Sequence, residues 1–352
     1  MQTVLIIKCR AESFRVPFYE ALGDTLAARN ITLTVAYGQP SGVTPDEPNP
    51  DSFRYGLRLR NKYIHLGPLT AVWQPVFSLV KRADLVIVQQ GNANLINHVL
   101  LALRQTGLVR VAFWGHGKNF QASNPHSLQE RFKRTCSRWV DHWFAYTEDT
   151  RSALLAARVP EQIITVVNNA IDSHAMRTQY ESITDCELTH LKERLSLAES
   201  MPVGIYCGRM YDIKNIPFLL RAVQLIKQEL PDFHFLAIGE GNDAAQVRTF
   251  ATRHAQWFHY FGRTVGREKA AYFRLAGAQL SPGAVGLSVV DSFAMLTPLV
   301  TTASGLHGPE ICYLRDGSNG RIVEGDENAY ASEVVKMFSS PSTILPLLPS
   351  LR

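Results

Sequence analysis

The sequence predicts an α/β protein made of two doubly wound, Rossmann-like domains. Two observations predict this fold: short apolar runs alternate with amphipathic helical patterns, and the alternation occurs twice, on either side of a polar stretch. The 352 residues are 46% hydrophobic and 19% charged, which is enough for two packed cores. We therefore expect two parallel sheets, each covered by helices on both faces, in domains that face a cleft.

The first 172 residues contain six strand-like runs. Amphipathic segments over 16–30 and 94–107 lie between them and predict helices. The runs cover 3–8, 31–37, 84–90, 110–115, 143–147 and 164–169. We assign residues 1–172 to an N-terminal domain.

A second β-α-β series begins after a polar, helix-prone stretch over 173–200, which we expect to be an interdomain passage. Its strand-like runs cover 202–210, 233–241, 257–262, 277–283, 298–303 and 319–324. These runs define a C-terminal domain over 201–330. Residues 331–352 are expected to be a tail, since its prolines oppose a long helix.

The cysteines and charges limit the function classes. Five scattered cysteines without a C-x-x-C pair predict reduced thiols and argue against a zinc site or a disulfide framework. The chain has no run of ~20 apolar residues and no signal peptide, so we expect a cytoplasmic protein. Residues 1–172 carry 19 lysines and arginines against 13 acids. This basic half suits an acidic partner, such as nucleic acid, an anionic membrane surface or a phosphorylated acceptor, or is simply a solvated surface.

A glycine and two cations follow the strand-like run 202–210. Gly208 ends the strand, Arg209 comes next, and Lys214 lies just before a helical pattern. Glycine allows close backbone approach, while Arg and Lys at a helix N-terminus suit a diphosphate. The alternative is two surface cations on a loop.

Glycine loops follow two further strands. Gly239 and Gly241 form a G-x-G pattern that an ordinary tight turn also explains. Gly283 and Gly286 lead into a helix, and Asp291 lies one or two turns inside it. Asp291 is placed to accept hydrogen bonds from ribose hydroxyls, or is a solvated helix acid.

The backbone N–H groups of Gly286, Leu287 and Ser288 open that helix. They predict an anion site, because the first turn of a helix has free amides and a positive dipole end.

Two more polar residues follow strands or open a helix. His116 lies between two glycines after the run 110–115, where it can reach a ligand, although a lone histidine is more often structural. Glu310 follows Pro309 at an expected helix start beside His307, and helix capping is the simpler explanation of it.

Taken together and in order, these segments resemble the family 4 glycosyltransferases of GT-B fold, of the bacterial polysaccharide-assembly type. "CGRMYDIKNIPFLLRAV" is similar to the family's G-R-x-x-x-x-K-x-x-x-x-L-L-x-A element, and "FLAIGEGND" and "GPEICYLRDGSNGRIV" follow in family order. The resemblance covers nearly the whole chain and is strongest over 203–323. It implies a retaining transferase that needs no metal or other cofactor.

The resemblance also implies the partners and the site residues. The donor is a nucleoside-diphosphate sugar bound by residues 201–330. The acceptor is a saccharide or lipid-linked saccharide on the side of residues 1–172, in O-antigen, capsule or exopolysaccharide synthesis, and no nucleic acid is expected. His116, Arg209 and Lys214 are the catalytic candidates. The donor-binding candidates are Gly208, Gly239, Gly241, Gly283, Gly286, Leu287, Ser288, Asp291 and Glu310.

The chain departs from the family at one position. The family usually carries two glutamates eight residues apart, where this sequence has Gly283 and Asp291. The lost carboxylate motivates a second hypothesis, a non-catalytic sugar-nucleotide-binding protein of the same fold. A third, an epimerase acting on a UDP-sugar, is disfavoured by the order of the motifs. We expect a glutamate at position 283 to be tolerated.

The segment 127–144, "SLQERFKRTCSRWVDHWF", combines cations with aromatic residues. On a helix its arginines share one face beside an apolar stripe, which predicts a peripheral contact with an anionic leaflet on the inner face of the cell membrane. Alternatively, the stripe packs on the domain's own sheet. The cations are Arg131, Lys133, Arg134 and Arg138, and the stripe is Phe132, Cys136, Trp139, Val140 and Trp143.

Overall fold

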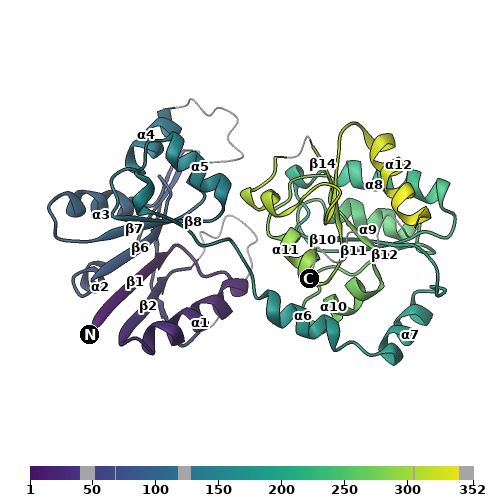
Figure 1. Cartoon of the computed structure of the whole chain (residues 1–352), viewed down its shortest axis with the longest axis horizontal. Coiled ribbons are helices and arrows are strands. Elements are labelled where there is room, and N and C mark those ends of the chain that lie inside the picture. Colours follow the sequence, from purple (N-terminus) through teal and green to yellow (C-terminus); the bar gives the residue numbers. More distant parts are fainter. Residues whose placement is uncertain (40–51, 68, 118–127, 304–305, 341–352) are drawn as a thin grey trace. The chain divides into compact units, whose positions relative to one another are not determined.

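A computed structural model describes residues 1–39, 52–67, 69–117, 128–303 and 306–340. The chain forms two compact units, Met1–Asp172 and Ser173–Arg352, shown in purple to teal and in teal to yellow in Figure 1. Each unit is built on a parallel sheet with helices packed against it (Figure 1). The predicted fold class, two doubly wound α/β units, is confirmed. Among the described residues, no helix has both the length and the apolar character needed to cross a membrane.

The first unit contains a seven-stranded parallel sheet in the order β3-β2-β1-β6-β7-β8-β9. All six expected runs form strands, and only the short β3 is unforeseen. β1 pairs with β2 on one side and β6 on the other, so the strand order reverses there. Doubly wound sheets bind ligands beyond the carboxyl ends of strands at such a reversal. The strands are β1 Gln2–Lys8, β2 Ile31–Tyr37, β3 Gly56–Arg58, β6 Leu85–Gln89, β7 Val111–Gly115, β8 His142–Ala145 and β9 Ile164–Val166.

The remaining elements of this unit connect the strands. An antiparallel hairpin, β4 Lys62–Leu66 with β5 Leu69–Trp73, forms a separate two-stranded sheet that the sequence analysis missed. The helices are α1 Val16–Ala27, α2 Phe77–Val80, α3 Leu95–Gln105, α4 Leu128–Cys136 and α5 Glu148–Ala156, with 3-10 turns η1 Ser13–Arg15 and η2 Glu161–Ile163.

The segment 127–144 is not one helix, contrary to expectation. α4 ends at Cys136, and Trp143 lies inside β8, where its indole N–H donates to the Ser137 carbonyl at 2.8 Å. Cys136, Val140 and Trp143 are buried in the core of the unit. Phe132 and Trp139 remain 46% and 44% exposed, so the predicted apolar stripe is divided between the core and the surface.

The second unit contains a six-stranded parallel sheet in the order β12-β11-β10-β13-β14-β15. All six expected runs form strands. The order reverses at β10, whose five residues are all buried between β11 and β13. The strands are β10 Val203–Cys207, β11 His234–Ile238, β12 Phe258–Tyr260, β13 Ala278–Leu280, β14 Leu299–Thr302 and β15 Gly320–Val323.

The expected interdomain passage belongs to the second unit. Residues 173–200 form α6 and α7, and α6 packs against α10 and α11. Tyr180 and Leu191 share a buried cluster with Ile205 of β10 and Phe273 of α10, which explains why this stretch does not behave as a linker. The helices are α6 Ser173–Glu181, α7 Asp185–Arg194, α8 Ile216–Glu229, α9 Ala244–Arg253, α10 Gly266–Leu275, α11 Ser288–Ala294 and α12 Glu327–Ser339, with η3 Asp212–Lys214 and η4 Pro309–Tyr313.

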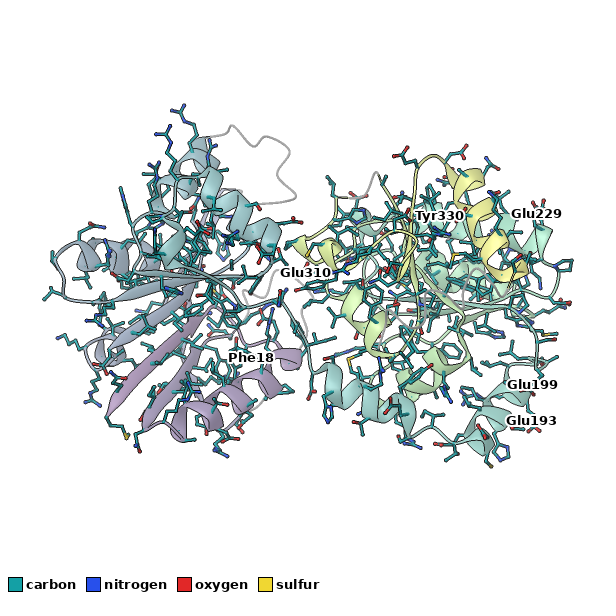
Figure 2. All side chains as sticks on the ribbon, viewed as in Figure 1. Phe18, Glu193, Glu199, Glu229, Glu310 and Tyr330 are labelled. Atoms are coloured by element: carbon teal, nitrogen blue, oxygen red, sulfur yellow. The ribbon has the colours of Figure 1, made fainter. Side chains whose placement is uncertain are left out.

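The expected tail is likewise part of this unit up to Ser339. α12 packs against α8, and Tyr330 (labelled in Figure 2) is fully buried and donates its hydroxyl to the Val300 carbonyl at 2.8 Å. The remainder of the expected tail, 341–352, lies outside the described residues.

Candidate functional site

A small pocket lies where the strand order of the second unit reverses. It is lined at the carboxyl ends of β10 and β13 and in the loops that follow them, and has a volume of about 10 Å³, room for about one water molecule. The pocket brings together four of the predicted site residues, Gly208, Lys214, Gly283 and Ser288. The other lining residues are Tyr206, Cys207, Ser281 and Ala284.

Lys214 is the cation of this pocket. It ends η3, and Asn215 then takes a left-handed conformation (φ 51°) that turns the chain into α8. The Lys214 ammonium donates to the Ala284 carbonyl in the glycine loop. Burial lowers the pKa of Lys214 to about 8, against the opposing effect of the Glu310 carboxylate. The site therefore holds a cation with little solvation, which favours an anionic ligand.

Arg209 occupies a different position from Lys214. Its side chain is exposed, and its backbone carbonyl accepts a hydrogen bond from the buried Tyr206 hydroxyl at 2.7 Å. The backbone of the loop after β10 is thus fixed, while the guanidinium reaches the surface.

Gly283 allows the glycine loop to pack on η3. A β-carbon at Gly283 would lie 2.2 Å from the Lys214 carbonyl carbon and 2.6 Å from the Ile213 carbonyl oxygen. The next amide, Ala284 N–H, donates to the same Ile213 carbonyl at 2.8 Å. Backbone atoms cannot move aside as a flexible side chain can. The expectation that a glutamate at position 283 is tolerated is therefore wrong.

Gly239 and Gly241 allow the loop after β11 to lie along the loop after β10. Their φ values are 145° and 148°, and β-carbons there would lie 1.8 Å from the Gly208 carbonyl oxygen and 2.1 Å from that of Met210. Met210 N–H also donates to the Glu240 carbonyl at 2.8 Å. The G-x-G pattern thus supports the loop that carries Gly208 and Arg209.

His307 fixes the glycine loop from its other side. Val285 N–H donates to His307 Nδ1 at 3.1 Å, and His307 Nε2 donates to the Thr302 carbonyl at 2.8 Å. This arrangement requires the neutral ring with its proton on Nε2. Burial lowers the pKa of His307, and the nearby Lys214 charge acts in the same direction, so the neutral form is favoured.

Glu310 is buried beside the same loop. Glu310, which is labelled in Figure 2, lies in η4 and is 3% exposed. Its Oε2 is 2.5 Å from where a β-carbon of Gly308 would stand and 3.9 Å from that of Gly286. The predicted residues Gly286, Lys214 and Glu310 thus belong to one region of the second unit. The role of Glu310 in donor binding stays a prediction.

Asp291 forms an ion pair that the sequence analysis missed. Its Oδ1 is 2.6 Å from Nζ of Lys269 on α10, and the side chains are 20% and 15% exposed. Burial alone would lower the pKa of Lys269, but the Cys207 thiol and the Asp291 carboxylate outweigh it and raise that pKa. The two residues are 22 positions apart on different helices, so no local pattern predicts the pair.

The first turn of α11 carries the predicted anion-binding amides. The carbonyls of Gly286 and Leu287 accept from Val289 and Val290 N–H at 3.2 and 3.0 Å, so this turn is helical. Ser288 also lines the pocket beside Lys214. α11 has only seven residues, and its dipole is correspondingly small. The amides of Gly286, Leu287 and Ser288 remain a prediction.

In the first unit, His116 follows β7 at the carboxyl edge of the sheet. Its ring meets the Tyr146 ring edge-on, with centroids 4.6 Å apart. Gly117 behind it has φ 68° and would place a β-carbon 3.1 Å from the Leu154 side chain. His116 therefore lies on a loop held against α5, at the edge where ligands bind in such sheets.

The same edge carries buried charges that the sequence analysis did not single out. Lys8, at the end of β1, is 3% exposed; its Nζ donates to Gln89 Oε1 at 3.1 Å and lies 3.6 Å from Glu12. Arg15 is also buried, and its guanidinium donates to Asn169 Oδ1. Burying a cation costs free energy unless the charge is paired. The apolar run "VLIIK" did not indicate that its lysine is buried.

Two family models match the chain. The one described as "Glycosyltransferase Family 4" matches residues 18–175, and the one described as "Glycosyl transferases group 1" matches residues 201–340. Among curated relatives, D-inositol 3-phosphate glycosyltransferase of Streptomyces coelicolor is 27% identical over 173 residues, 44% of this chain and 36% of the relative. The chain spans less than half the length of the curated relatives it matches.

Solved structures extend the likeness to both units. HepE of Anabaena in complex with UDP has a TM-score of 0.66 at 14% identity, over 100% of this chain and 93% of that one. A glycosyltransferase from Rickettsia africae has a TM-score of 0.68 at 14% identity, over 99% and 92%. At such identities the likeness shows the fold.

Proposed function

The chain belongs to the family 4 glycosyltransferases of GT-B fold, and from this premise we propose that it transfers a sugar from a nucleoside-diphosphate sugar to a saccharide acceptor. The observation that carries the proposal is the poorly solvated Lys214 ammonium in the pocket at the carboxyl ends of β10 and β13. A fixed cation in such a place stabilises the charge that develops on a leaving diphosphate.

In the proposed reaction the bond between the anomeric carbon and the diphosphate breaks, and the diphosphate leaves with the electron pair. Lys214 and Arg209 neutralise it, since each supplies a positive charge after the same strand. An acceptor hydroxyl forms the new bond from the face that the diphosphate leaves, and its proton passes to a leaving-phosphate oxygen. The configuration at the anomeric carbon is then retained.

Because HepE of Anabaena was solved with UDP, uridine diphosphate is the first nucleotide to test. The acceptor is a saccharide, lipid-linked or free, in cell-surface polysaccharide synthesis, and is assigned to the first unit. The buried charges of Lys8 and Arg15 and the loop of His116, all at the carboxyl edge of that sheet, support this assignment.

Calorimetric titration with UDP, GDP and ADP tests the donor side. Arg209→Ala and Lys214→Ala should each weaken binding of the preferred diphosphate by roughly tenfold or more, because a charge-assisted contact contributes about 1.5–3 kcal/mol. Arg253→Ala, which removes an exposed cation from α9, is the matched control. Unchanged affinity in both site variants would overturn the placement of the diphosphate.

A radiolabelled donor, with and without saccharide acceptors, tests the chemistry. Transfer that depends on an acceptor supports the proposal. Nucleotide binding without any release of the sugar would instead identify a binding protein, which the loss of the family carboxylate at Gly283 first suggested. Conversion of the donor sugar without an acceptor would identify an epimerase.

A further inference from the structure

The residues that follow β1 expose an apolar face at the carboxyl edge of the first sheet. η1 runs directly into α1, and the rings of Phe14, Pro17 and Phe18 in this stretch are exposed, Phe14 by 39% and Phe18 by 43%. Spacings of three and four residues place these rings on one side of the helical stretch. We call the face made of Phe14, Pro17 and Phe18 the aromatic platform.

The platform continues into the core of the unit. Phe18, which is labelled in Figure 2, has its ring centroid 5.3 Å from that of Trp114 on β7. Trp114 is 7% exposed, and its ring meets the Tyr146 ring, after β8, edge-on at 5.9 Å. Phe18 is therefore the exposed end of an aromatic cluster and not an isolated surface side chain.

Arg15 fixes the platform in position. Its side chain is buried, and its guanidinium lies 5.4 Å from the ring centroids of both Phe14 and Trp114. The guanidinium also donates to Asn169 Oδ1 and, at 3.3 Å, to the Ala170 carbonyl. These two residues follow β9, the last strand of the sheet, so one buried side chain ties the platform to the opposite edge. A surface that is already fixed loses less entropy when it binds a ligand.

Polar groups at the end of the neighbouring strand β6 connect with the same cluster. Lys8, at the end of β1, has its Nζ 5.8 Å from the Trp114 ring centroid and donates to Gln89 Oε1 at 3.1 Å. Gln89 is partly exposed, and its side-chain amide also carries N–H donors. The strand order reverses at β1, where ligands of doubly wound sheets bind. Rings beside amide groups at this place suit a ligand with an apolar face and a hydroxyl-bearing edge.

A pyranose ring is a ligand of this kind. Its axial C–H bonds gather on the faces of the ring, while its equatorial hydroxyls point outward. The face of an aromatic ring is electron-rich and attracts the slightly positive hydrogens of C–H bonds. An open platform also accepts one ring of a longer saccharide.

We propose that the aromatic platform binds one sugar ring of the saccharide acceptor, with the C–H face of that ring against Phe14 and Phe18. The platform selects pyranoses with three axial C–H bonds on one face, such as β-glucosides and β-galactosides. It rejects α-mannosides, which have an axial oxygen on each face. This inference rests on the proposed function, since a glycosyltransferase requires an acceptor, and goes beyond it by naming the class of acceptor sugar and the residues that bind it.

Saturation-transfer NMR of the whole chain with methyl β-D-glucopyranoside and methyl β-D-galactopyranoside, without a donor, tests the contact. Saturation should be strongest at the hydrogens on C1, C3 and C5, which share one face of the sugar. Methyl α-D-mannopyranoside should bind roughly tenfold more weakly. Even saturation around the ring, no saturation of either β-glycoside, or equal binding of the mannoside would overturn the proposal.

Two double variants separate ring stacking from general apolar contact. Phe14→Leu with Phe18→Leu keeps apolar side chains but removes the flat rings, and should weaken glycoside binding roughly tenfold. Phe14→Tyr with Phe18→Tyr keeps the rings and should retain binding. Phe77→Leu with Phe132→Leu is the matched control and should change nothing. Both control residues are similarly exposed, and their helices α2 and α4 pack on the face of the sheet opposite to α1.

UDP affinity and melting temperature in each variant identify the ligand and report folding. Both should equal the wild-type values. A loss of UDP affinity that parallels the loss of glycoside binding, at an unchanged melting temperature, would overturn the proposal by showing that the platform stacks a nucleotide base.

Transfer assays distinguish a failure of this inference from a failure of the proposed function. The leucine variant should raise the KM for a β-glycoside acceptor roughly tenfold and leave the KM for the donor unchanged. Transfer with an unchanged acceptor KM in that variant would overturn the platform alone. Face-selective glycoside binding without any transfer would overturn the proposed function and support the platform as a saccharide-binding surface.

Discussion

Gly283 and Lys214 approach so closely that a β-carbon on the glycine would lie 2.2 Å from the carbonyl carbon of the lysine. The family acid therefore cannot be restored at position 283 by adding a side chain. In this loop the Ala284 N–H donates to the Ile213 carbonyl, and the Ala284 carbonyl accepts from the Lys214 ammonium. If the chain transfers a sugar as proposed, other groups must hold that sugar, and Glu310, buried beside the same loop, is a candidate.

Gly283→Ala should destabilise the protein by about 1–3 kcal/mol, because the methyl group must displace backbone atoms of η3. Gly286→Ala is the matched control, since its β-carbon would meet nothing nearer than Glu310 Oε2 at 3.9 Å. Urea unfolding of both variants measures the difference. Equal stability of the two variants would contradict the close packing at Gly283.

Binding of the nucleoside diphosphate should weaken as pH rises through about 8. Lys214 has a pKa of about 8 in the unliganded protein, so above that value the site loses the charge that attracts the diphosphate. Lys214→Arg should flatten this dependence, because a guanidinium stays protonated throughout the range. Calorimetric titrations between pH 6.5 and 9.5 measure how the affinity for the diphosphate depends on pH. A wild-type affinity that does not change above pH 8 would exclude a contact between Lys214 and the diphosphate.

Asp291→Asn should remove the preference for a ribonucleotide. If the carboxylate binds ribose hydroxyls, the wild-type protein prefers UDP to its 2′-deoxy and 3′-deoxy forms, and the variant does not. Lys269→Gln breaks the same ion pair but retains the carboxylate, and so should keep the preference while losing stability. Loss of overall affinity without any change in preference would show that Asp291 acts only by pairing with Lys269.

Acid should destabilise the second unit through His259. Burial lowers its pKa to about 4, and the neighbouring His234, 3.3 Å away between ring nitrogens, acts in the same direction. Between pH 6.5 and 4 the unfolded chain binds a proton at this residue that the folded chain does not, so stability falls as pH falls through that window.

The melting temperature should therefore decline as the pH is lowered from 7.5 to 4.5, and His259→Gln should make that decline smaller. His190→Gln is the control, because the His190 side chain is 74% exposed. The same dependence of melting temperature on pH in wild type and in His259→Gln would contradict the assignment of this effect to His259.

The strands and the strand-end glycines could be predicted because they depend on local sequence. Runs such as "TVLIIK" and "PVGIYCG" are apolar over most of their length, as is typical of buried parallel strands. The hairpin of β4 and β5 was missed because its strands, "KYIHL" and "LTAVW", mix polar, aromatic and apolar residues and show no sustained apolar run. The segment of α6 and α7 was wrongly predicted to be an interdomain passage because its apolar residues are sparse. These residues are buried only by packing against β10 and α10, which the sequence does not reveal.

The sequence identified several residues of the candidate site, but not the contacts that these residues make. The sequence places Lys214 and Gly283 after strands, and adjacency of β10 and β13 in the sheet then brings them together. Lys269 and His307 could not be assigned roles, because their partners are set by how helices and loops pack. The segment after α4 was misjudged for a related reason: helical spacing continues through Trp143, but β8 takes that residue into the core.

The reversal of strand order at β1 and β10 has a consequence for synthesis of the chain. β1 is complete within the first eight residues, but its second neighbour, β6, begins only at Leu85. β10 likewise pairs with β13, which begins at Ala278. On the ribosome each central strand therefore has one unpaired edge until the later strand emerges, and such edges invite pairing with other chains. Refolding yield should thus depend on protein concentration, and a nascent chain that stops after β2 should be a client of chaperones.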